Sequence, residues 1–156
     1  MTRPVLTINN LVVHYPGAAL PTLDGLDLSL KAGERLALVG PSGCGKSTVA
    51  RAVLQLLPEG SRCTGQLELA GQDPRQLKRP ALRRLRGEAV GLVFQDPMTR
   101  LNPLLTIGDH LADTLEAHRS SWRHKRIQSR AKELLERVGI SPTRYGSYPH
   151  EFSGGM

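Results

Sequence analysis

The glycine-rich segment at residues 40–47 has the composition and spacing of a phosphate-binding loop. Its sequence, GPSGCGKS, matches the pattern G-x-x-x-x-G-K-[ST]. Glycines let the backbone approach phosphate oxygens closely, and the N–H groups at the start of a following helix attract an anion. We expect the Lys46 ammonium to reach the β- and γ-phosphates of a nucleotide, and the Ser47 hydroxyl is a hard oxygen ligand suited to Mg²⁺. The segment therefore predicts the binding of a nucleoside triphosphate together with magnesium.

Every residue of this loop, and the one after it, is a predicted nucleotide contact. Thr48 can donate a hydrogen bond to the α-phosphate, whereas Cys44 fills a free position of the pattern and is not expected to act as a nucleophile. The predicted contacts are Gly40, Pro41, Ser42, Gly43, Cys44, Gly45, Lys46, Ser47 and Thr48. A glycine-rich turn with a solvated lysine is the alternative interpretation, and the elements on either side of the loop bear on the choice.

Those elements are a short apolar strand before the loop and a helix after it. Residues 35–39 (RLALV) are almost wholly apolar, as in a strand that is buried on both faces. Residues 46–57 place their apolar side chains on one face of a helix. Further strands are predicted at residues 5–15, 23–30, 65–69 and 89–94, and a basic helical stretch at residues 74–86. This strand–loop–helix order favours a phosphate-binding loop in an α/β core.

The pattern changes after Gln95, where strand signals end and helical periodicity begins. Apolar residues recur at helical spacing over residues 107–115 and again over residues 127–138, and Gly139 follows as a C-cap. The second apolar series consists of Ile127, Ala131, Leu134, Leu135 and Val138. We therefore expect one partial domain with two parts. They are an α/β nucleotide-binding core at residues 1–95 and a helical subdomain at residues 96–156.

The charge of the chain is compatible with an anionic partner but does not require one. The 156 residues include 21 basic and 14 acidic side chains, which give a formal net charge of +7. Much of the positive charge lies in residues 75–86 and 119–130, which we interpret as solvated helix faces. Trp122 is the only Phe, Tyr or Trp in the second stretch, so the stacking of nucleic-acid bases is not supported there. No nucleic acid is expected as a partner, since nucleotide phosphates suit the same positive charge.

Neither the N-terminus nor the cysteines indicate secretion or a membrane span. No run approaches the ~20 apolar residues that cross a bilayer, and the first residues lack the apolar region of a secretory signal. Cys44 and Cys63 fit neither a disulfide framework nor a metal-ligand pattern, so a reduced, cytoplasmic setting is expected. Any association with a membrane is therefore expected to go through a partner protein.

Two further motifs distinguish among the families that share a phosphate-binding loop. They are FQDP at residues 94–97 and FSGGM at residues 152–156. With the loop, they resemble the ATP-binding cassette of ABC transporters, in which a glutamine called the Q-loop precedes a helical insert and a signature, commonly LSGGQ, closes it. Residues 93–103 (VFQDPMTRLNP), 106–108 (TIG) and 148–156 (YPHEFSGGM) look like the ATPase subunits of dipeptide, oligopeptide and nickel importers. The resemblance covers essentially the whole chain.

The resemblance assigns roles to residues on both sides of the phosphate loop. Gln95 would contact Mg²⁺ and the attacking water. Lys46 and Gln95 are therefore the implied catalytic residues, and Ser47 and Gln95 are the implied metal ligands. Tyr15 would stack on the adenine, with packing against a neighbouring strand as the alternative.

The last residues resemble the family's signature. The implied contacts with the γ-phosphate of ATP held by a second subunit, in a head-to-tail dimer, are Ser153, Gly154 and Gly155. Met156 stands where the commoner signature has Gln. In the family the Walker B strand, the catalytic glutamate, the D-loop and the switch histidine follow the signature, and residues 1–156 contain none of them. The chain could be a fragment of a longer protein or a truncated copy, and both interpretations stay open. Residues 1–156 alone are not expected to hydrolyse ATP.

The expected fold is an α/β P-loop NTPase core of the ABC ATPase type, with an antiparallel β-part at the N-terminus, a helical subdomain and the C-terminal strands missing. The implied function is to couple the binding and hydrolysis of ATP, with Mg²⁺, to the uptake of small peptides or nickel. Implied partners are a second ATP-binding subunit, permease subunits that hold it at the cytoplasmic face of the inner membrane, and indirectly a substrate-binding protein. Residues 97–105 are expected to dock on the permease.

Three alternatives to this function stay open. The first is a nucleotide-binding fragment without catalysis. The second is a soluble ABC ATPase of nucleic-acid maintenance or translation, which would need a zinc insertion, coiled-coil arms or tandem cassettes that the sequence does not contain. The third is a basic nucleic-acid-binding module, which only the positive net charge supports.

Overall fold

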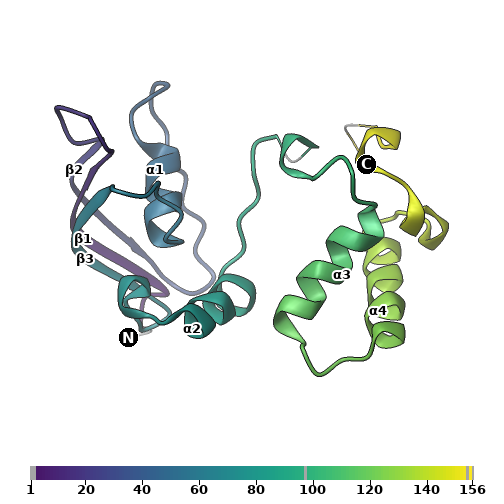
Figure 1. Cartoon of the computed structure of the whole chain (residues 1–156). Helices are drawn as coiled ribbons and strands as arrows, with labels where there is room; N and C mark the ends of the chain where they lie inside the picture. Colours follow the sequence, from purple (N-terminus) through teal and green to yellow (C-terminus); the bar gives the residue numbers. More distant parts are fainter. Residues whose placement is uncertain (1–2, 97, 154, 156) are drawn as a thin grey trace. The chain divides into compact units, whose positions relative to one another are not determined.

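The computed structural model describes residues 3–96, 98–153 and 155 of the chain (Figure 1). It divides into two compact units, Met1–Gly91 and Leu92–Met156, which are described separately below. The first unit holds the strands and the phosphate loop, and the second is helical. Within the described ranges, no helix is both long enough and apolar enough to cross a lipid bilayer.

A three-stranded antiparallel sheet forms the β-part of the first unit. Strand β1 (Leu6–His14) lies between β2 (Leu23–Leu30) and β3 (Arg62–Leu69), so the strand order is β2-β1-β3 (Figure 1). The β-branched and apolar residues of these segments suit a pleated surface with one buried face. The predicted antiparallel β-part at the N-terminus is thus confirmed, and β3 begins earlier than the residues 65–69 predicted for it.

Helix α1 (Lys46–Val53) packs against this sheet and completes the hydrophobic core. Val49 and Ala52 of the helix share that core with Ile8 of β1, and neither Ile8 nor Ala52 has any exposed surface. Burying a side chain of the size of Val49 or Ile8 stabilises a fold by roughly 1.5–3 kcal/mol. The helix ends earlier than the predicted residue 57, and the chain soon leaves helical geometry altogether at Gln55, where φ is 55°.

The basic stretch at residues 74–86 is not one solvated helix. It and the residues that follow form the 3-10 turn η1 (Pro74–Gln76), helix α2 (Arg79–Arg84) and the π-type turn η2 (Leu85–Ala89). Arg86 donates from Nε to the Leu54 carbonyl at 2.8 Å and from Nη2 to the Gln55 carbonyl at 2.6 Å. Because the last carbonyls of a helix have no partner within it, Arg86 caps the C-terminal end of α1. Our interpretation of the whole stretch as a solvated face is wrong for this residue.

The two buried strands predicted at residues 35–39 and 89–94 do not form. Residues 34–40 have no regular structure and are all exposed, with Val39 at 92%. Ala89 ends η2, and Val93 is 91% exposed in the irregular backbone that follows. A strand needs a neighbour for its N–H and C=O groups, and neither segment pairs with β1, β2 or β3. Both predictions are wrong for the described residues, because apolar composition does not supply a pairing partner.

The second unit is built on two helices joined by a short connection. Helix α3 (Ile107–His118) opens with a capping box. The Thr106 hydroxyl accepts from the Asp109 N–H at 3.1 Å, and the Asp109 carboxylate accepts from the Thr106 N–H at 2.9 Å. Helix α4 (His124–Arg137) packs on α3. Its buried residues, all predicted from the periodicity, are Ile127, Ala131 and Leu135.

The end of α4 confirms one terminal prediction and corrects another. Gly139 has φ 78°, and its N–H donates to the Glu136 carbonyl at 2.9 Å, as in a glycine C-cap. The Ile140 N–H donates to the Leu135 carbonyl at 2.9 Å. Val138, the last member of the predicted apolar series, is 71% exposed, and it lies one residue beyond the end of α4 with non-helical backbone angles.

Candidate nucleotide-binding site

The phosphate loop depends on glycines in the left-handed region of backbone space. Gly43 has φ 84° and Gly45 has φ 95°, conformations that residues with a side chain rarely adopt. A Cβ at Gly45 would also lie 2.6 Å from Leu23 Cδ2 and 2.9 Å from the Thr22 carbonyl oxygen. The loop is thus fixed against the start of β2 at the point where α1 begins. The exposed residues of the loop are Gly40, Pro41, Ser42, Gly43, Cys44 and Ser47.

The first turn of α1 presents backbone donors that the protein does not use. The first N–H bonded back into the helix is that of Val49, which donates to the Gly45 carbonyl at 3.1 Å. The N–H groups of Lys46, Ser47 and Thr48 have no acceptor among the described residues, as the start of a helix requires. No acidic side chain lies in this turn. These donors and the positive end of the helix dipole therefore form a site for an anion such as phosphate.

The Lys46 side chain folds back over the loop that precedes it. Its Nζ donates to the Gly40 carbonyl at 2.8 Å and to the Pro41 carbonyl at 2.6 Å, and it lies 3.5 Å from Cys44 Sγ. An ammonium has three donors, so the loop itself satisfies this one. To contact a phosphate as predicted, Lys46 must exchange at least one loop acceptor for a phosphate oxygen.

Tyr15 and Thr48 lie side by side at the edge of the loop. Thr48 is 5% exposed, and its Oγ1 lies 3.2 Å from the Tyr15 hydroxyl. Burial raises the pKa of Tyr15, but hydrogen bonds with Thr48 and Arg51 and the charge of Arg51 outweigh it and hold the pKa below its ordinary value. The sequence analysis did not identify Arg51 as a residue of the site. Its position one helical turn beyond Ser47 places the two side chains on the same face of α1, which could have indicated it. Stacking of Tyr15 on adenine and a bond from Thr48 to the α-phosphate stay predictions.

The start of α1 also offers a ligand for magnesium. Ser47 is exposed at the second residue of the helix, and its hydroxyl is a hard oxygen donor beside the free N–H groups. In the part of the chain that the structure describes, no group of three or more His, Cys, Asp or Glu side chains could hold a metal ion. Ser47 therefore fits a magnesium ion that also takes oxygens from a nucleotide and water.

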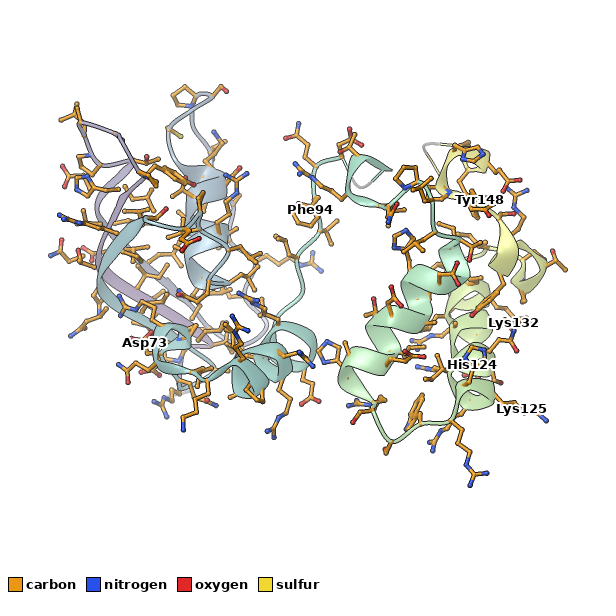
Figure 2. All side chains as sticks on the ribbon, viewed as in Figure 1. Asp73, Phe94, His124, Lys125, Lys132 and Tyr148 are labelled. Carbon is orange, nitrogen blue, oxygen red and sulfur yellow. The ribbon has the colours of Figure 1, made fainter. Side chains whose placement is uncertain are left out.

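Gln95, the second predicted metal ligand, is exposed in a bend of the second unit. The preceding Phe94 lies on irregular backbone before the 3-10 turn η3 (Met98–Arg100), as Figure 2 shows. The Arg100 guanidinium stands 5.3 Å from the centre of the Phe94 ring. The roles predicted for Gln95 toward Mg²⁺ and water stay predictions, because it belongs to a different unit from Ser47.

The predicted signature follows two short turns of the second unit. These are η4 (Pro142–Gly146) and η5 (Pro149–Glu151), which lead to Ser153, exposed in irregular backbone. Gly155 is exposed in a turn, whereas Gly154 and Met156 lie outside the described residues. The contact of this segment with a partner's γ-phosphate stays a prediction.

The sequence has extensive similarity to curated transport proteins. It is 41% identical over 156 residues to the oligopeptide transport ATP-binding protein OppD of Mycobacterium tuberculosis. The aligned region covers 97% of this chain and 26% of OppD. It is 39% identical over 162 residues to the probable D,D-dipeptide transport ATP-binding protein DdpD of Escherichia coli. This aligned region covers 100% of this chain and 49% of DdpD. The chain thus spans less than half the length of either relative.

Solved structures and a family model agree with this similarity. The chain matches cbiO1 from Clostridium perfringens, part of the ABC transporter complex cbiONQ, with a TM-score of 0.71 at 24% identity, over 97% of this chain and 57% of that one. It matches a bacterial Atm1-family ABC exporter with ATP bound at a TM-score of 0.63 and 29% identity, over 98% of this chain and 25% of that one. The family model described as ABC transporter covers residues 23–156. With its phosphate loop at the start of α1 and this match over most of its length, the chain belongs to the ABC transporter family.

Proposed function

We propose that the chain is part of the ATP-binding subunit of an ABC importer, in which the binding and hydrolysis of ATP drive the uptake of small peptides. The observation that carries the proposal is the start of α1, where free backbone N–H groups, the Lys46 ammonium and the Ser47 hydroxyl lie within one turn. The names of two relatives, OppD and DdpD, concern oligopeptide and D,D-dipeptide transport, which supports peptides rather than nickel as the substrate.

The proposed binding mode uses the loop as a cradle for the phosphates. The N–H groups of Lys46, Ser47 and Thr48 hold phosphate oxygens, and the Lys46 ammonium moves from the Gly40 carbonyl to the γ-phosphate. When bound, Mg²⁺ neutralises charge that develops on the phosphate oxygens. Ser47 would hold the metal, and Gln95 is proposed as its second protein ligand and as a contact of the attacking water.

The proposed partners are a second ATP-binding subunit and the permease subunits of the transporter, which hold the protein at the cytoplasmic face of the membrane. The segment proposed to contact the permease is residues 97–105, of which Pro97 lies outside the described residues. Leu104 is 82% exposed, and large exposed apolar side chains are typical of interaction surfaces when they lie in contiguous patches. A substrate-binding protein would interact indirectly, through the permease.

The head-to-tail dimer in this proposal is expected to bring Ser153 of one subunit beside the phosphate loop of the other. Cys44 is exposed in that loop, and Cys63 is the other thiol of the chain. In the complete gene product, the double variant Cys63→Ser and Ser153→Cys should form a disulfide between subunits under mild oxidation. Because both segments face one ATP, adding Mg²⁺ and ATP should raise the yield of cross-linked dimer severalfold on a non-reducing gel.

Two controls separate this result from random oxidation. With Cys44→Ser added, the ATP-dependent dimer should disappear. A thiol placed by Ser129→Cys on the exposed side of α4, in place of the one at position 153, should show no response to ATP. An ATP-dependent yield that is equal for positions 129 and 153, or absent from both, would contradict the head-to-tail arrangement.

A further inference from the structure

Arg144 ties together the residues directly before the predicted signature serine. Its Nη2 donates to the Glu151 carbonyl at 2.7 Å. Its guanidinium carbon stands 4.7 Å from the centre of the Phe152 ring, a cation–π contact. Ser153 follows Phe152 in the chain and is exposed. One guanidinium therefore fixes the two residues that deliver Ser153, and a hydrogen bond from a charged donor is among the stronger ones in proteins.

The turn that carries Arg144 is itself anchored on both helices of the second unit. Turn η4 packs on α3 and α4. The Tyr145 ring lies so close to Gly108 that a Cβ there would overlap it, although Gly108 has ordinary helical geometry. Lys132 extends from α4 (Figure 2), and its Nζ stands 5.6 Å from the centre of the Tyr145 ring. The Ile107 N–H donates to the Ser147 carbonyl at 2.9 Å. The helices thus give Arg144 a fixed base.

Arg144 is held by its planar guanidinium group, which makes one hydrogen bond and one contact with an aromatic ring. Its Nε is buried and has no partner among the described residues, whereas most buried donors in proteins are satisfied. The guanidinium is therefore placed by the Glu151 carbonyl and the Phe152 ring rather than by a complete set of hydrogen bonds. A lysine could keep the bond to the carbonyl, but it lacks the planar group that stacks on an aromatic face.

We propose that Arg144 is a positioning residue that holds Ser153 in place for the association of two subunits around ATP. This inference rests on the proposed function, in which Ser153 contacts ATP held by the partner. Without Arg144, residues 151–153 must be ordered when the subunits meet, and the entropy lost in that step weakens the association. Binding of ATP to the phosphate loop of a single subunit does not involve Arg144 and is unaffected.

The Arg144→Ala change is tested in the complete gene product carrying Cys63→Ser and Ser153→Cys. The yield of the ATP-dependent disulfide with Cys44 should fall by about tenfold, the loss expected for one hydrogen bond to a charged group. Arg144→Lys should fall between this variant and the parent, because it restores the carbonyl bond alone. The dissociation constant of a fluorescent ATP analogue, measured on the same samples, should change by less than about twofold, since the phosphate loop is intact.

Two further variants keep the outcome clear. Phe152→Leu removes the stacking partner without touching Arg144 and should also lower the yield. Arg130→Ala is the matched control, because this arginine of α4 pairs with Glu133 at 2.9 Å and should leave the yield unchanged. If the parent pair cross-links with ATP and Arg144→Ala does so equally well, Arg144 is not a positioning residue. If the parent pair does not cross-link, the head-to-tail proposal itself fails.

Discussion

Replacement of Lys46 by alanine should weaken the binding of ATP by at least about tenfold, because a hydrogen bond to a charged group is worth ~1.5–3 kcal/mol. The side chain supplies the positive charge of the loop, and its Nζ already lies at the loop carbonyls of Gly40 and Pro41. Gly40 and Pro41 are exposed residues, so water can replace the ammonium and the fold should survive. The measurement is a titration of a fluorescent ATP analogue against the parent and the Lys46→Ala variant.

The matched control for this change is Lys125→Ala, which removes the same charge from an exposed lysine at the start of α4 (Figure 2). It should bind the analogue as the parent does. A Lys46→Ala variant with the circular dichroism spectrum of the parent and an unchanged dissociation constant would mean that the loop does not hold the phosphates. An equal loss in both variants would point to the net charge of the protein instead.

A polypeptide of residues 1–156 by itself should bind ATP but show no turnover. Phosphoryl transfer needs a positioned water and a metal held on two sides, and within this polypeptide only Gln95 is proposed for the water. Ser153 is close to the last residue of such a polypeptide, so the helix that a signature opens cannot form in it. Although Arg144 holds Ser153, the N–H groups that should face a partner's γ-phosphate then lack the helix that would orient them, and preorganised donors of this kind are a large part of catalysis.

The turnover prediction is checked by phosphate release from purified residues 1–156, with Lys46→Ala as the control. Equal, background release from both proteins is the expected result. Release that depends on Lys46 and approaches the ~1 per second found at the low end for enzymes would show that other residues perform the chemistry. Analogue binding measured on the same sample establishes that the phosphate loop is folded.

The backbone of the loop at residues 40–47 could be predicted from sequence because its conformation is local, whereas its binding of phosphate stays a prediction. Gly43 and Gly45 are needed for backbone angles within the loop, and Lys46 and Ser47 follow directly at the start of α1. The interior of α4 was predictable for the same reason, because the period of its apolar residues depends on one helix alone. Gly139, which ends that helix, acts through its own left-handed backbone.

Features that depend on distant parts of the chain were not predictable in the same way. Residues 35–39 have the composition of a buried strand, but a strand exists only where another one pairs with it. Arg86 reaches carbonyls that lie 32 and 31 residues away in sequence, so its role at the end of α1 has no local signature. The contact of Tyr15 with Thr48 spans 33 residues and likewise follows from the packing of α1 on the sheet.

The contacts of Arg144 could not be predicted for a different reason. The signature motif begins near Ser153, whereas the side chain that contacts the residues before Ser153 is Arg144. Arg144 and Glu151 are seven positions apart in the sequence and belong to two different turns, and no periodic pattern links them. Only the folded turns bring the guanidinium over Phe152.

The most direct test of the central claim is the response of backbone amides to nucleotide. Adding Mg²⁺ and ATP to isotopically labelled protein should shift the amide resonances of Gly45, Lys46, Ser47 and Thr48 more than any others, because their N–H groups lie at the start of α1 and donate to no acceptor among the described residues. Adenosine without phosphates should leave them nearly unchanged. Unshifted resonances at these four residues, with larger shifts elsewhere in the chain, would contradict the proposal that this loop binds the phosphates of ATP.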